Sequence, residues 1–318
     1  RLAGWPGPDV ASPTPTPIPT PVDVPHVARK IGVDVNMAQD NDYGKALNLA
    51  KAAGLQELKI FLGWNVLETG VRVYNDDLLN LINVYYTMPM HLVIAPINTT
   101  ILIVPEDLKP LAFDDPIMVQ RYKDLISYVV AKLPNIQIAS INVGCEFDIF
   151  FGTDAAKWAQ FEKFYAQAAN HIRTAKPGVR VSAEATLNGL LGPNKDRLIA
   201  LNRYSDVIGV SYYPISADAT VKPIASVLPD LAQVDALYGE QLYLYQIGFP
   251  TGAANNSSEQ LQADFVREAL KYAPAGFLNF TWLHDYSAQA AIDAAGGYGN
   301  TDPKFIAFLQ SLGLRTFA

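Results

Sequence analysis

Two stretches of the sequence end an apolar run on a polar residue that could do chemistry. The run IQIASINVG (136–144) leads into Cys145 and Glu146, and the run LYLY (242–245) leads into Gln246. An ionised glutamate at the end of a buried strand is costly unless it is solvated or paired. Such a position can raise its pKa toward the range that a general acid needs. Glu146 is therefore a candidate acid–base group; the structural alternative is a residue that caps the next loop or pairs with an arginine.

The other apolar runs also end on aromatic, amide or carboxylate residues. Trp and Tyr rings stack on the C–H faces of sugars, and amides and carboxylates hydrogen-bond to hydroxyl groups. This lining suits a neutral, hydroxyl-rich polymer better than a charged metabolite, although aromatic residues also fill barrel cores. We expect the following residues to line a carbohydrate-binding groove: Asn36, Trp64, Asn98, Glu184, Tyr212, Tyr213, Trp282 and His284.

Eight apolar runs would have to position these residues. They are near-continuous rather than alternating, which is typical of parallel strands buried on both faces, and helical stretches separate most of them. The pattern predicts one (β/α)8 TIM barrel over residues 28–318, with its chemistry at the carboxyl ends of the strands. A doubly wound sheet is the alternative, but IGVDVNMAQDN (31–41) lacks the glycine-rich phosphate turn. The expected strands are 31–36, 58–62, 91–97, 136–144, 179–185, 206–212, 241–246 and 276–282.

Composition narrows the choice of partners. The formal net charge of −7 argues against nucleic acid as a partner, and four His with one Cys argue against a Cys/His zinc site. We expect no cofactor, and no stretch reaches the roughly 18 apolar residues that span a bilayer. Residues 1–27 contain the Pro/Thr run SPTPTPIPTP (12–21), which predicts an extended tether or, alternatively, a disordered tail. A tether favours a secreted or surface-attached protein.

Four motifs in register resemble the clan A glycoside hydrolases, and among them the endo-β-1,4-galactanase-like group. They are VGCEFD (143–148), VIGVSYYP (207–214), QIGFPT (246–251) and TWLHDY (281–286). The resemblance implies a retaining β-glycoside hydrolase acting on a poly- or oligosaccharide. It assigns Glu146 as the general acid/base and Trp282 as a platform under the sugar. Tyr212 or Tyr213 would contact the nucleophile.

Two positions depart from the family pattern. Cys145 stands where the family has an asparagine that bonds to the sugar 2-hydroxyl, and Gln246 stands where it has the nucleophilic glutamate. Retaining enzymes need two carboxyl groups about 5–5.5 Å apart, and a neutral amide is a very poor nucleophile. We therefore expect this chain to be inactive or weakened as a hydrolase.

Three explanations of Gln246 remain open at this level. A Glu→Gln replacement could have been introduced into a working enzyme, or a natural relative could have kept the groove and lost catalysis, so that it binds glycan. The second carboxylate could also have moved to Glu184, Asp34 or Asp285, where an inverting pair would need about 6.5–9.5 Å between carboxyl groups. The second departure, at Cys145, favours the last two explanations.

Overall fold

The computed structural model describes residues 29–239, 242–272 and 275–318, which form a mixed α/β fold around a mostly parallel sheet. The proposed tether at 1–27 lies outside the described residues. All eight predicted strands are present, and their ends differ from the expected ones by a few residues. They are β1 (Lys30–Val33), β2 (Leu58–Gly63), β5 (Met90–Ala95), β8 (Ile138–Cys145), β9 (Arg180–Thr186), β10 (Ile208–Tyr212), β11 (Leu242–Ile247) and β12 (Phe277–Phe280).

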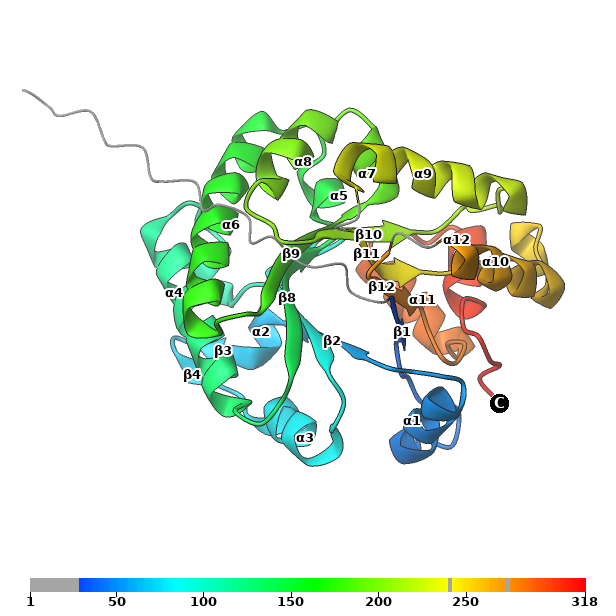
Figure 1. Ribbon diagram of the computed structural model, residues 1–318, viewed down its shortest axis with the longest axis horizontal. Helices are drawn as coiled ribbons and strands as arrows, with labels where there is room; N and C mark the ends of the chain where they lie inside the picture. The colour runs from blue at the N-terminus through cyan, green and yellow to red at the C-terminus, as the bar shows by residue number, and fades with distance from the viewer. Residues whose placement is uncertain (1–28, 240–241, 273–274) are drawn as a thin grey trace, which may run out of the picture.

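Each of these strands is followed by a helix that returns the chain to the start of the next strand, and the helices surround the sheet (Figure 1). Aspartate side chains accept first-turn N–H groups at the starts of four of these helices, and two of the four have proline as their first residue. The returning helices are α1 (Tyr43–Ala52), α3 (Asp77–Tyr85), α4 (Pro116–Lys132), α6 (Ala155–Ala175), α8 (Lys195–Asn202), α9 (Val227–Tyr238), α10 (Glu259–Lys271) and α12 (Pro303–Gln310).

Further helices and short strands lie in the segments that follow the carboxyl ends of the strands. Two hairpins follow β2 and β5, and short helices begin directly after β2, β8 and β9. These elements are α2 (Trp64–Leu67), β3 (Glu68–Gly70), β4 (Val73–Tyr74), β6 (Ile97–Asn98), β7 (Ile101–Leu102), α5 (Phe147–Phe151), α7 (Leu187–Leu191) and α11 (Ala288–Gly297).

The eight strands pair in the order β1-β12-β11-β10-β9-β8-β5-β2, and all of these pairings are parallel. The order follows the chain without the reversal that a doubly wound sheet has. Within the described part of the chain no strand ladder joins β1 to β2, but Ile31 O accepts from Gln56 N at 2.9 Å, and Ile31 N donates to Gln56 Oε1 at 3.0 Å. The first and last strands of this path therefore lie next to each other.

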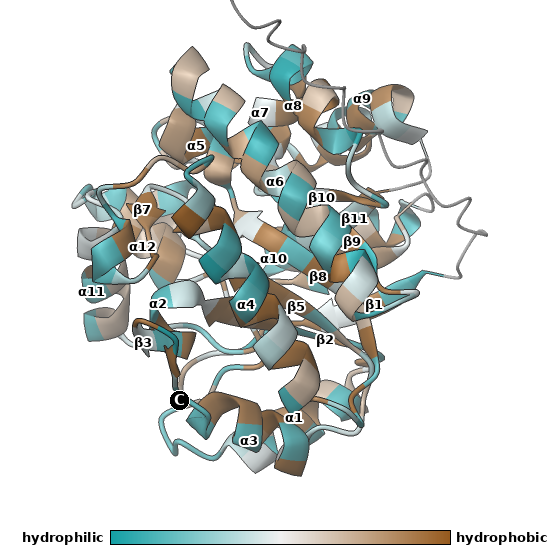
Figure 2. Cartoon of the chain, turned by 90° about the vertical axis from the view of Figure 1, so that its left-hand side faces the viewer, coloured by the Kyte–Doolittle hydropathy of each residue, from teal (hydrophilic) through white to brown (hydrophobic). Residues whose placement is uncertain are grey.

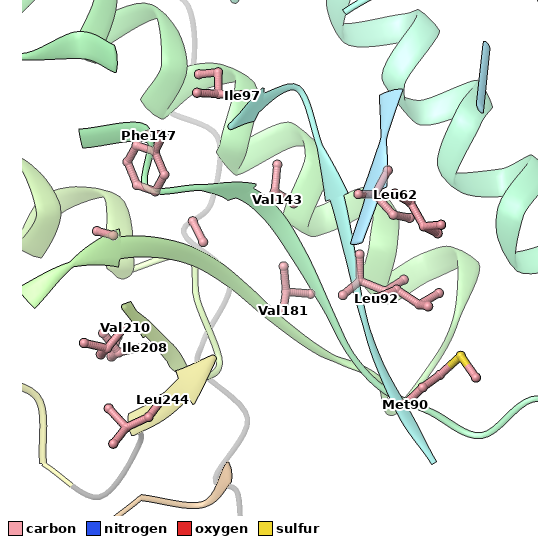
Figure 3. Close-up of a cluster of buried hydrophobic side chains, with 14 of the residues drawn as sticks. Leu62, Met90, Leu92, Ile97, Val143, Phe147, Val181, Ile208, Val210 and Leu244 are labelled. Carbon is pink, nitrogen blue, oxygen red and sulfur yellow. The ribbon is translucent and has the colours of Figure 1, made fainter. Parts of the chain in front are cut away.

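The main hydrophobic core lies between the sheet and its helices. Leucine, isoleucine and valine side chains on alternate strand positions point to this layer, and Figure 3 shows Leu62, Leu92, Val143, Val181 and Leu244 among them. Hydrophilic and hydrophobic residues mix along α4 and α6, whereas β5 is hydrophobic except at His91 (Figure 2). Burial of these apolar faces stabilises the scaffold that carries the strand ends.

The opposite face of the sheet, which we call the interior face, carries polar residues. Lys59, His91, Ser140, Asn142 and Glu184 are all buried there. His91 stacks on Phe277 with ring centroids 3.8 Å apart and contacts Ser140 Oγ through Nδ1 at 2.7 Å. Hydrogen bonds such as these offset the cost of burying polar groups, so the interior face holds a fixed polar network beneath the strand ends.

Irregular pairing changes the direction of two strands at their carboxyl ends. Val210 and Ser211 of β10 pair with Leu244 and Gln246 of β11, so Tyr245 is an extra residue, and the β8–β9 register shifts between Asn142 and Cys145. A β-bulge of this kind re-aims the following side chain. It allows Tyr245, whose hydroxyl contacts Ser140 Oγ at 2.7 Å, and Gln246 both to reach the interior side.

Candidate active site at the strand ends

Glu146 directly follows β8 and is held by two hydroxyl groups. Thr99 Oγ1 donates to Glu146 Oε2 at 2.7 Å, and Ser211 Oγ donates to Glu146 Oε1 at 2.6 Å. Glu146 and Thr99 both have left-handed backbone conformations, with φ of 49° and 53°. Such conformations are uncommon for residues other than glycine and concentrate at functional sites. The carboxyl group of Glu146 is therefore fixed in orientation while it remains partly exposed.

Gln246 lies at the end of β11, and three contacts fix its side-chain amide. Its Nε2 donates to Glu184 Oε1 at 2.8 Å and to Cys145 Sγ at 3.0 Å, and its Oε1 accepts from Tyr213 OH at 2.8 Å. Both hydrogens of the amide are used, which leaves one acceptor position on Oε1.

Ser211 and Cys145 join the two candidate residues. Ser211 is the strand partner of Gln246 across β10 and β11, and its hydroxyl reaches Glu146. Cys145 precedes Glu146 in the chain and accepts from the Gln246 amide. The structure therefore brings Glu146 and Gln246 to one place, which we call the strand-end site, formed by Glu146, Gln246, Cys145, Glu184, Ser211, Tyr213 and Thr99.

Glu184 lies beneath Gln246 and is 0% exposed. Burial raises its pKa to about 8, and the nearby Glu146 adds to the rise, while Lys59 and the Gln246 amide oppose it. Asn142 Nδ2 also donates to Glu184, at 3.3 Å. At neutral pH the protonated form of Glu184 therefore predominates, and the group cannot reach a ligand without displacing Gln246.

A buried ion pair lies next to Glu184. Lys59 Nζ is 3.0 Å from Asp34 Oδ2, and Asn279 Nδ2 donates to the other oxygen of Asp34 at 2.9 Å. Burial lowers the pKa of Lys59, but the carboxylates of Asp34 and Glu184 outweigh it and hold that pKa above its usual value. Both oxygens of Asp34 are therefore engaged inside the protein.

Cys145 behaves as a thiol rather than as a thiolate. Burial, followed by the charges of Glu184 and Glu146, raises its pKa well above the usual value. Its sulfur accepts a hydrogen bond from Gln246 and has no base beside it that would activate it. Cys145 belongs to the site as a contact of Gln246.

The aromatic candidates separate into two groups. Tyr213 contacts Gln246, whereas Tyr212 is 2% exposed, packs in the main core and donates to Asp230 Oδ2 at 3.1 Å. Trp282 follows β12, is partly exposed, and stacks on Tyr286 with ring centroids 3.9 Å apart. Tyr213 and Trp282 are thus available to a ligand, and the expectation that Tyr212 lines the groove is wrong.

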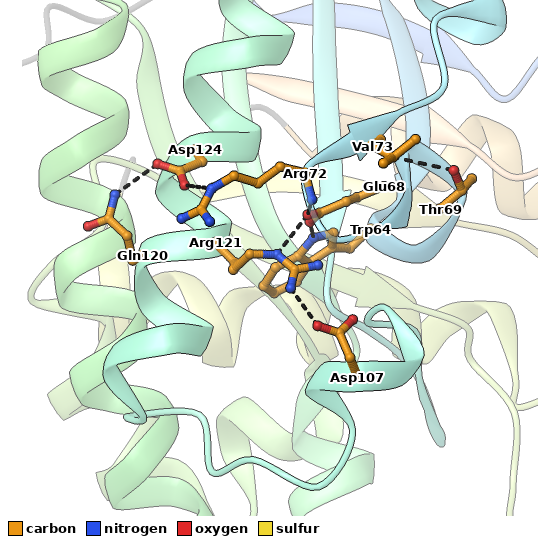
Figure 4. Close-up of polar contacts among 9 residues, drawn as sticks. All are labelled: Trp64, Glu68, Thr69, Arg72, Val73, Asp107, Gln120, Arg121 and Asp124. Atoms are coloured by element: carbon orange, nitrogen blue, oxygen red, sulfur yellow. Dashed lines mark hydrogen bonds and ion pairs between the residues drawn. The ribbon is translucent and has the colours of Figure 1, made fainter.

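Trp64 also lies elsewhere than expected. Its ring is 0% exposed and its Nε1 donates to Glu68 Oε2 at 2.7 Å, because α2 begins at this residue and turns the ring into the core. Arg121 Nε donates to the other Glu68 oxygen at 2.7 Å, and Asp107 also pairs with Arg121 (Figure 4). This buried network supports the first hairpin, and Trp64 is not a groove residue.

Asn36 and His284 bond to each other. Asn36 Nδ2 donates to His284 O at 2.7 Å, and His284 N donates to Asn36 Oδ1 at 2.8 Å. One hydrogen and one lone pair of the Asn36 amide are used in these bonds, and His284 is 3% exposed, so the pair ties two loops together and His284 does not face a ligand. Asn98 is partly exposed and is the strand partner of Cys145, which keeps it beside the strand-end site.

One residue that the sequence reasoning missed is Phe61 on β2. Its side chain is 40% exposed although it pairs with β5, and it shares the interior face with Lys59. Its strand partner Val93 packs against Cys145 on that face. Phe61 therefore offers an open aromatic ring near the strand-end site, and its place two residues after Lys59 in LKIFLG (58–63) is the signal that puts the two side chains on one face.

Asp285 does not belong to this constellation. It accepts from Gly313 N at 2.9 Å, burial raises its pKa to about 6, and it lines a separate cavity with Thr251, Glu259 and Arg267. Among the residues that the structure describes, no group of three or more His, Cys, Asp or Glu side chains could hold a metal ion. No helix in that same part of the chain is long and apolar enough to cross a membrane.

Comparison with known proteins supports the fold. No family model matches the chain, and no curated protein does. Among solved structures, a GH5_18 protein from Streptomyces cattleya in complex with Manβ1-4GlcNAc superposes with a TM-score of 0.70 at 14% identity, over 91% of this chain and 76% of that one. A GH5_18 protein from Bifidobacterium longum subsp. infantis gives 0.69 at 14% identity, over 92% and 75% of the two chains.

A third neighbour is an exo-β-1,4-mannosidase from Opitutaceae bacterium strain TAV5, with a TM-score of 0.69 at 17% identity, over 90% of this chain and 56% of that one. Further neighbours are a family 39 glycoside hydrolase and a β-glucuronidase. The fold is thus shared with glycoside hydrolases of the clan that the motifs resemble, and the galactanase-like group is not singled out. At these identities the likeness shows the fold alone.

Proposed function

We propose that the eight βα units close into a (β/α)8 barrel of the clan A glycoside hydrolase type, which binds a β-linked glycan between Glu146 and Gln246. The observation that carries the proposal is the joining of these two side chains through Ser211 and Cys145 at the strand ends. The open rings of Phe61 and Trp282 supply faces for sugar C–H groups. We also propose that residues 1–27 tether an exported barrel.

In this proposal Glu146 gives a proton to the glycosidic oxygen and later takes one from water. Gln246 occupies the position of the nucleophile, opposite the acid. Because an amide neither attacks the anomeric carbon nor carries a negative charge, hydrolysis through an enzyme-bound intermediate at Gln246 is slow or absent.

The contacts argue against a relocated carboxylate. Glu184 is fully buried behind Gln246, and Asp34 is engaged by Lys59. Asp285 lines a different cavity. None of these three carboxyl groups can flank a glycosidic bond together with Glu146 in the present arrangement.

A glycan-binding relative without catalysis is the second candidate, and one contact favours it. Gln246 Nε2 donates to Glu184 Oε1 at 2.8 Å, whereas a glutamate at position 246 would place a second carboxyl group at about that distance from Glu184 in a buried setting that disfavours charge. The surroundings of Gln246 thus suit an amide, which speaks for a glutamine that belongs to this site rather than one introduced into a site built for glutamate.

A panel of β-linked polysaccharides that includes β-1,4-galactan tests the proposal. Reducing-end release and binding are measured for the parent chain, Gln246→Glu and Glu146→Gln, with Gln233→Glu on exposed α9 as the matched control. We expect binding by the parent and hydrolysis by Gln246→Glu. Binding by the parent without hydrolysis by any variant would favour the second candidate. Absence of both binding and hydrolysis across the panel would refute the proposal.

A further inference from the structure

We infer that the chain hydrolyses 2-acetamido-2-deoxy-β-glycosides, with the acetamido oxygen of the substrate as the nucleophile, Glu146 as the acid/base and Gln246 as the residue that orients the acetamido group. The inference rests on the proposed glycan-binding site and names the substrate class for it. Gln246 then takes part in catalysis by orienting the substrate, and it does not stand for a nucleophile that has been lost.

The first support is that the described residues of the strand-end site offer one free carboxyl group. Glu146 is partly exposed, whereas Glu184 and Asp148 are buried and Asp34 pairs with Lys59 at 3.0 Å. Double displacement through the protein needs a second carboxylate, and so does activation of water by a separate base. With one carboxyl group, hydrolysis requires a substrate that carries its own nucleophile.

The second support is the fixed direction of the Gln246 amide. Both hydrogens of Nε2 are held by Glu184 and Cys145, and Tyr213 occupies one lone pair of Oε1. In this orientation the carbonyl oxygen keeps one open acceptor position for a ligand. An acetamido N–H is a donor that fits this position.

The chemistry follows from that hydrogen bond. An N–H bonded to Gln246 Oε1 turns the acetamido oxygen toward the anomeric carbon on the side opposite the leaving group. As the ring closes, positive charge spreads over the acetamido nitrogen and carbon, and the N–H becomes a stronger donor. The bond to Gln246 therefore strengthens in the transition state, which is the condition for an interaction to accelerate a reaction.

The proton and electron balance closes with Glu146 alone. In the first step the acetamido oxygen bonds to the anomeric carbon and the bond to the leaving oxygen breaks. The leaving oxygen takes the proton of Glu146, which leaves an oxazolinium ion beside a carboxylate. In the second step Glu146 takes a proton from water, the water oxygen bonds to the anomeric carbon, and the acetamido group is restored. The configuration is retained.

The two hydroxyl groups around Glu146 fit this cycle. Thr99 and Ser211 both donate to the carboxylate form, and a hydroxyl can rotate to accept when the carboxyl group carries a proton. They hold the group in place through both steps without supplying a charge of their own.

The test uses the whole parent chain and matched aryl glycosides. Aryl 2-acetamido-2-deoxy-β-glucoside and -galactoside are compared with the corresponding 2-hydroxy glycosides, and the acetamido series is extended to mono-, di- and trifluoroacetamido derivatives. We expect the acetamido substrates to be cleaved at least about a hundredfold faster than the 2-hydroxy ones. We also expect kcat to fall with each fluorine, because fluorine weakens the attacking oxygen.

A thiazoline analogue of the cyclic intermediate gives a second readout, since it should bind more tightly than the free sugar. Equal rates on both substrate types, or rates insensitive to fluorine, would overturn the inference. So would a parent that cleaves no acetamido glycoside while Gln246→Glu cleaves a 2-hydroxy glycoside, although the proposed glycosidase site would then stand. Failure of the parent to bind any glycan would refute the proposed function itself.

Discussion

Replacing Gln246 by glutamate should change how the stability of the protein depends on pH, and the size of this change can be worked out from one distance. Gln246 Nε2 lies 2.8 Å from Glu184 Oε1, so Gln246→Glu brings two carboxyl groups to about that separation. Two unit charges 2.8 Å apart repel by about 6 kcal/mol at an effective dielectric constant of about 20, which corresponds to about 4 pH units. The pair therefore keeps one proton at neutral pH.

The proton should stay on Glu184, which is fully buried and whose pKa is already about 8 in the parent chain. A carboxyl group with a raised pKa binds more protons in the folded than in the unfolded protein, between its unfolded and its folded pKa. Stability accordingly falls as pH rises through that window, by up to about 1.4 kcal/mol per pH unit. In the parent the window ends near pH 8, and in Gln246→Glu it extends further into the alkaline range.

The assay is denaturant unfolding between pH 5 and pH 10, analysed as differences between variants. The control is the exchanged variant Glu184→Gln/Gln246→Glu, which moves the carboxyl group without adding one. We expect the free energy of unfolding of Gln246→Glu to keep falling above pH 8, where that of the parent levels off. The double variant Glu184→Gln/Gln246→Glu should show the smallest fall over the whole pH range. The reasoning is refuted if Gln246→Glu follows the parent curve, or if the exchanged variant falls as steeply as the single one.

Two further predictions concern the groove and the scaffold. Phe61→Ala should weaken glycan binding about tenfold in calorimetric titration because the open ring is lost. The control Leu81→Ala, at an exposed position of α3, should leave affinity unchanged. Equal affinities of Phe61→Ala and the parent would contradict the placement of the ring. Arg121→Ala leaves the buried carboxylate of Glu68 without its cation and should cost about 3–5 kcal/mol in urea unfolding. Arg72 forms an exposed ion pair with Asp124, so Arg72→Ala should lower the free energy of unfolding by less than about 1 kcal/mol. Similar losses in Arg121→Ala and Arg72→Ala would contradict this account.

The strand positions could be predicted from the sequence because parallel strands that are buried on both faces consist of near-continuous apolar runs. Glu146 and Gln246 could be predicted for the same reason, since each is the first polar residue after such a run. The joining of these residues at one place follows from the parallel arrangement, which brings all carboxyl ends of the strands to one edge.

The directions of individual side chains could not be predicted in the same way. Tyr212 and Tyr213 are adjacent, and only the face that each occupies separates a core residue from a contact of Gln246. Gln246 and Tyr245 both reach the interior side because a bulge breaks the alternation. Trp64 turns into the core because a short helix begins there without a strong sequence signal.

The roles of Thr99 and Ser211 were also beyond the sequence. Both reach Glu146 from other strand ends. Thr99 has a left-handed backbone conformation, which is usually predicted from a glycine, and the sequence has threonine at this position. The protonation of Glu184 depends on complete burial, which follows from tertiary packing rather than from the local sequence. Contacts between residues far apart in the chain thus decided what the strand-end residues can do.

The most direct measurement is a crystal structure of the parent chain with a bound β-linked oligosaccharide. We predict a glycosidic oxygen within about 3 Å of the Glu146 carboxyl group and an anomeric carbon that faces Gln246 from the other side. A glycan bound away from the strand ends, or Glu146 and Gln246 side chains more than about 10 Å apart on opposite rims, would contradict the account.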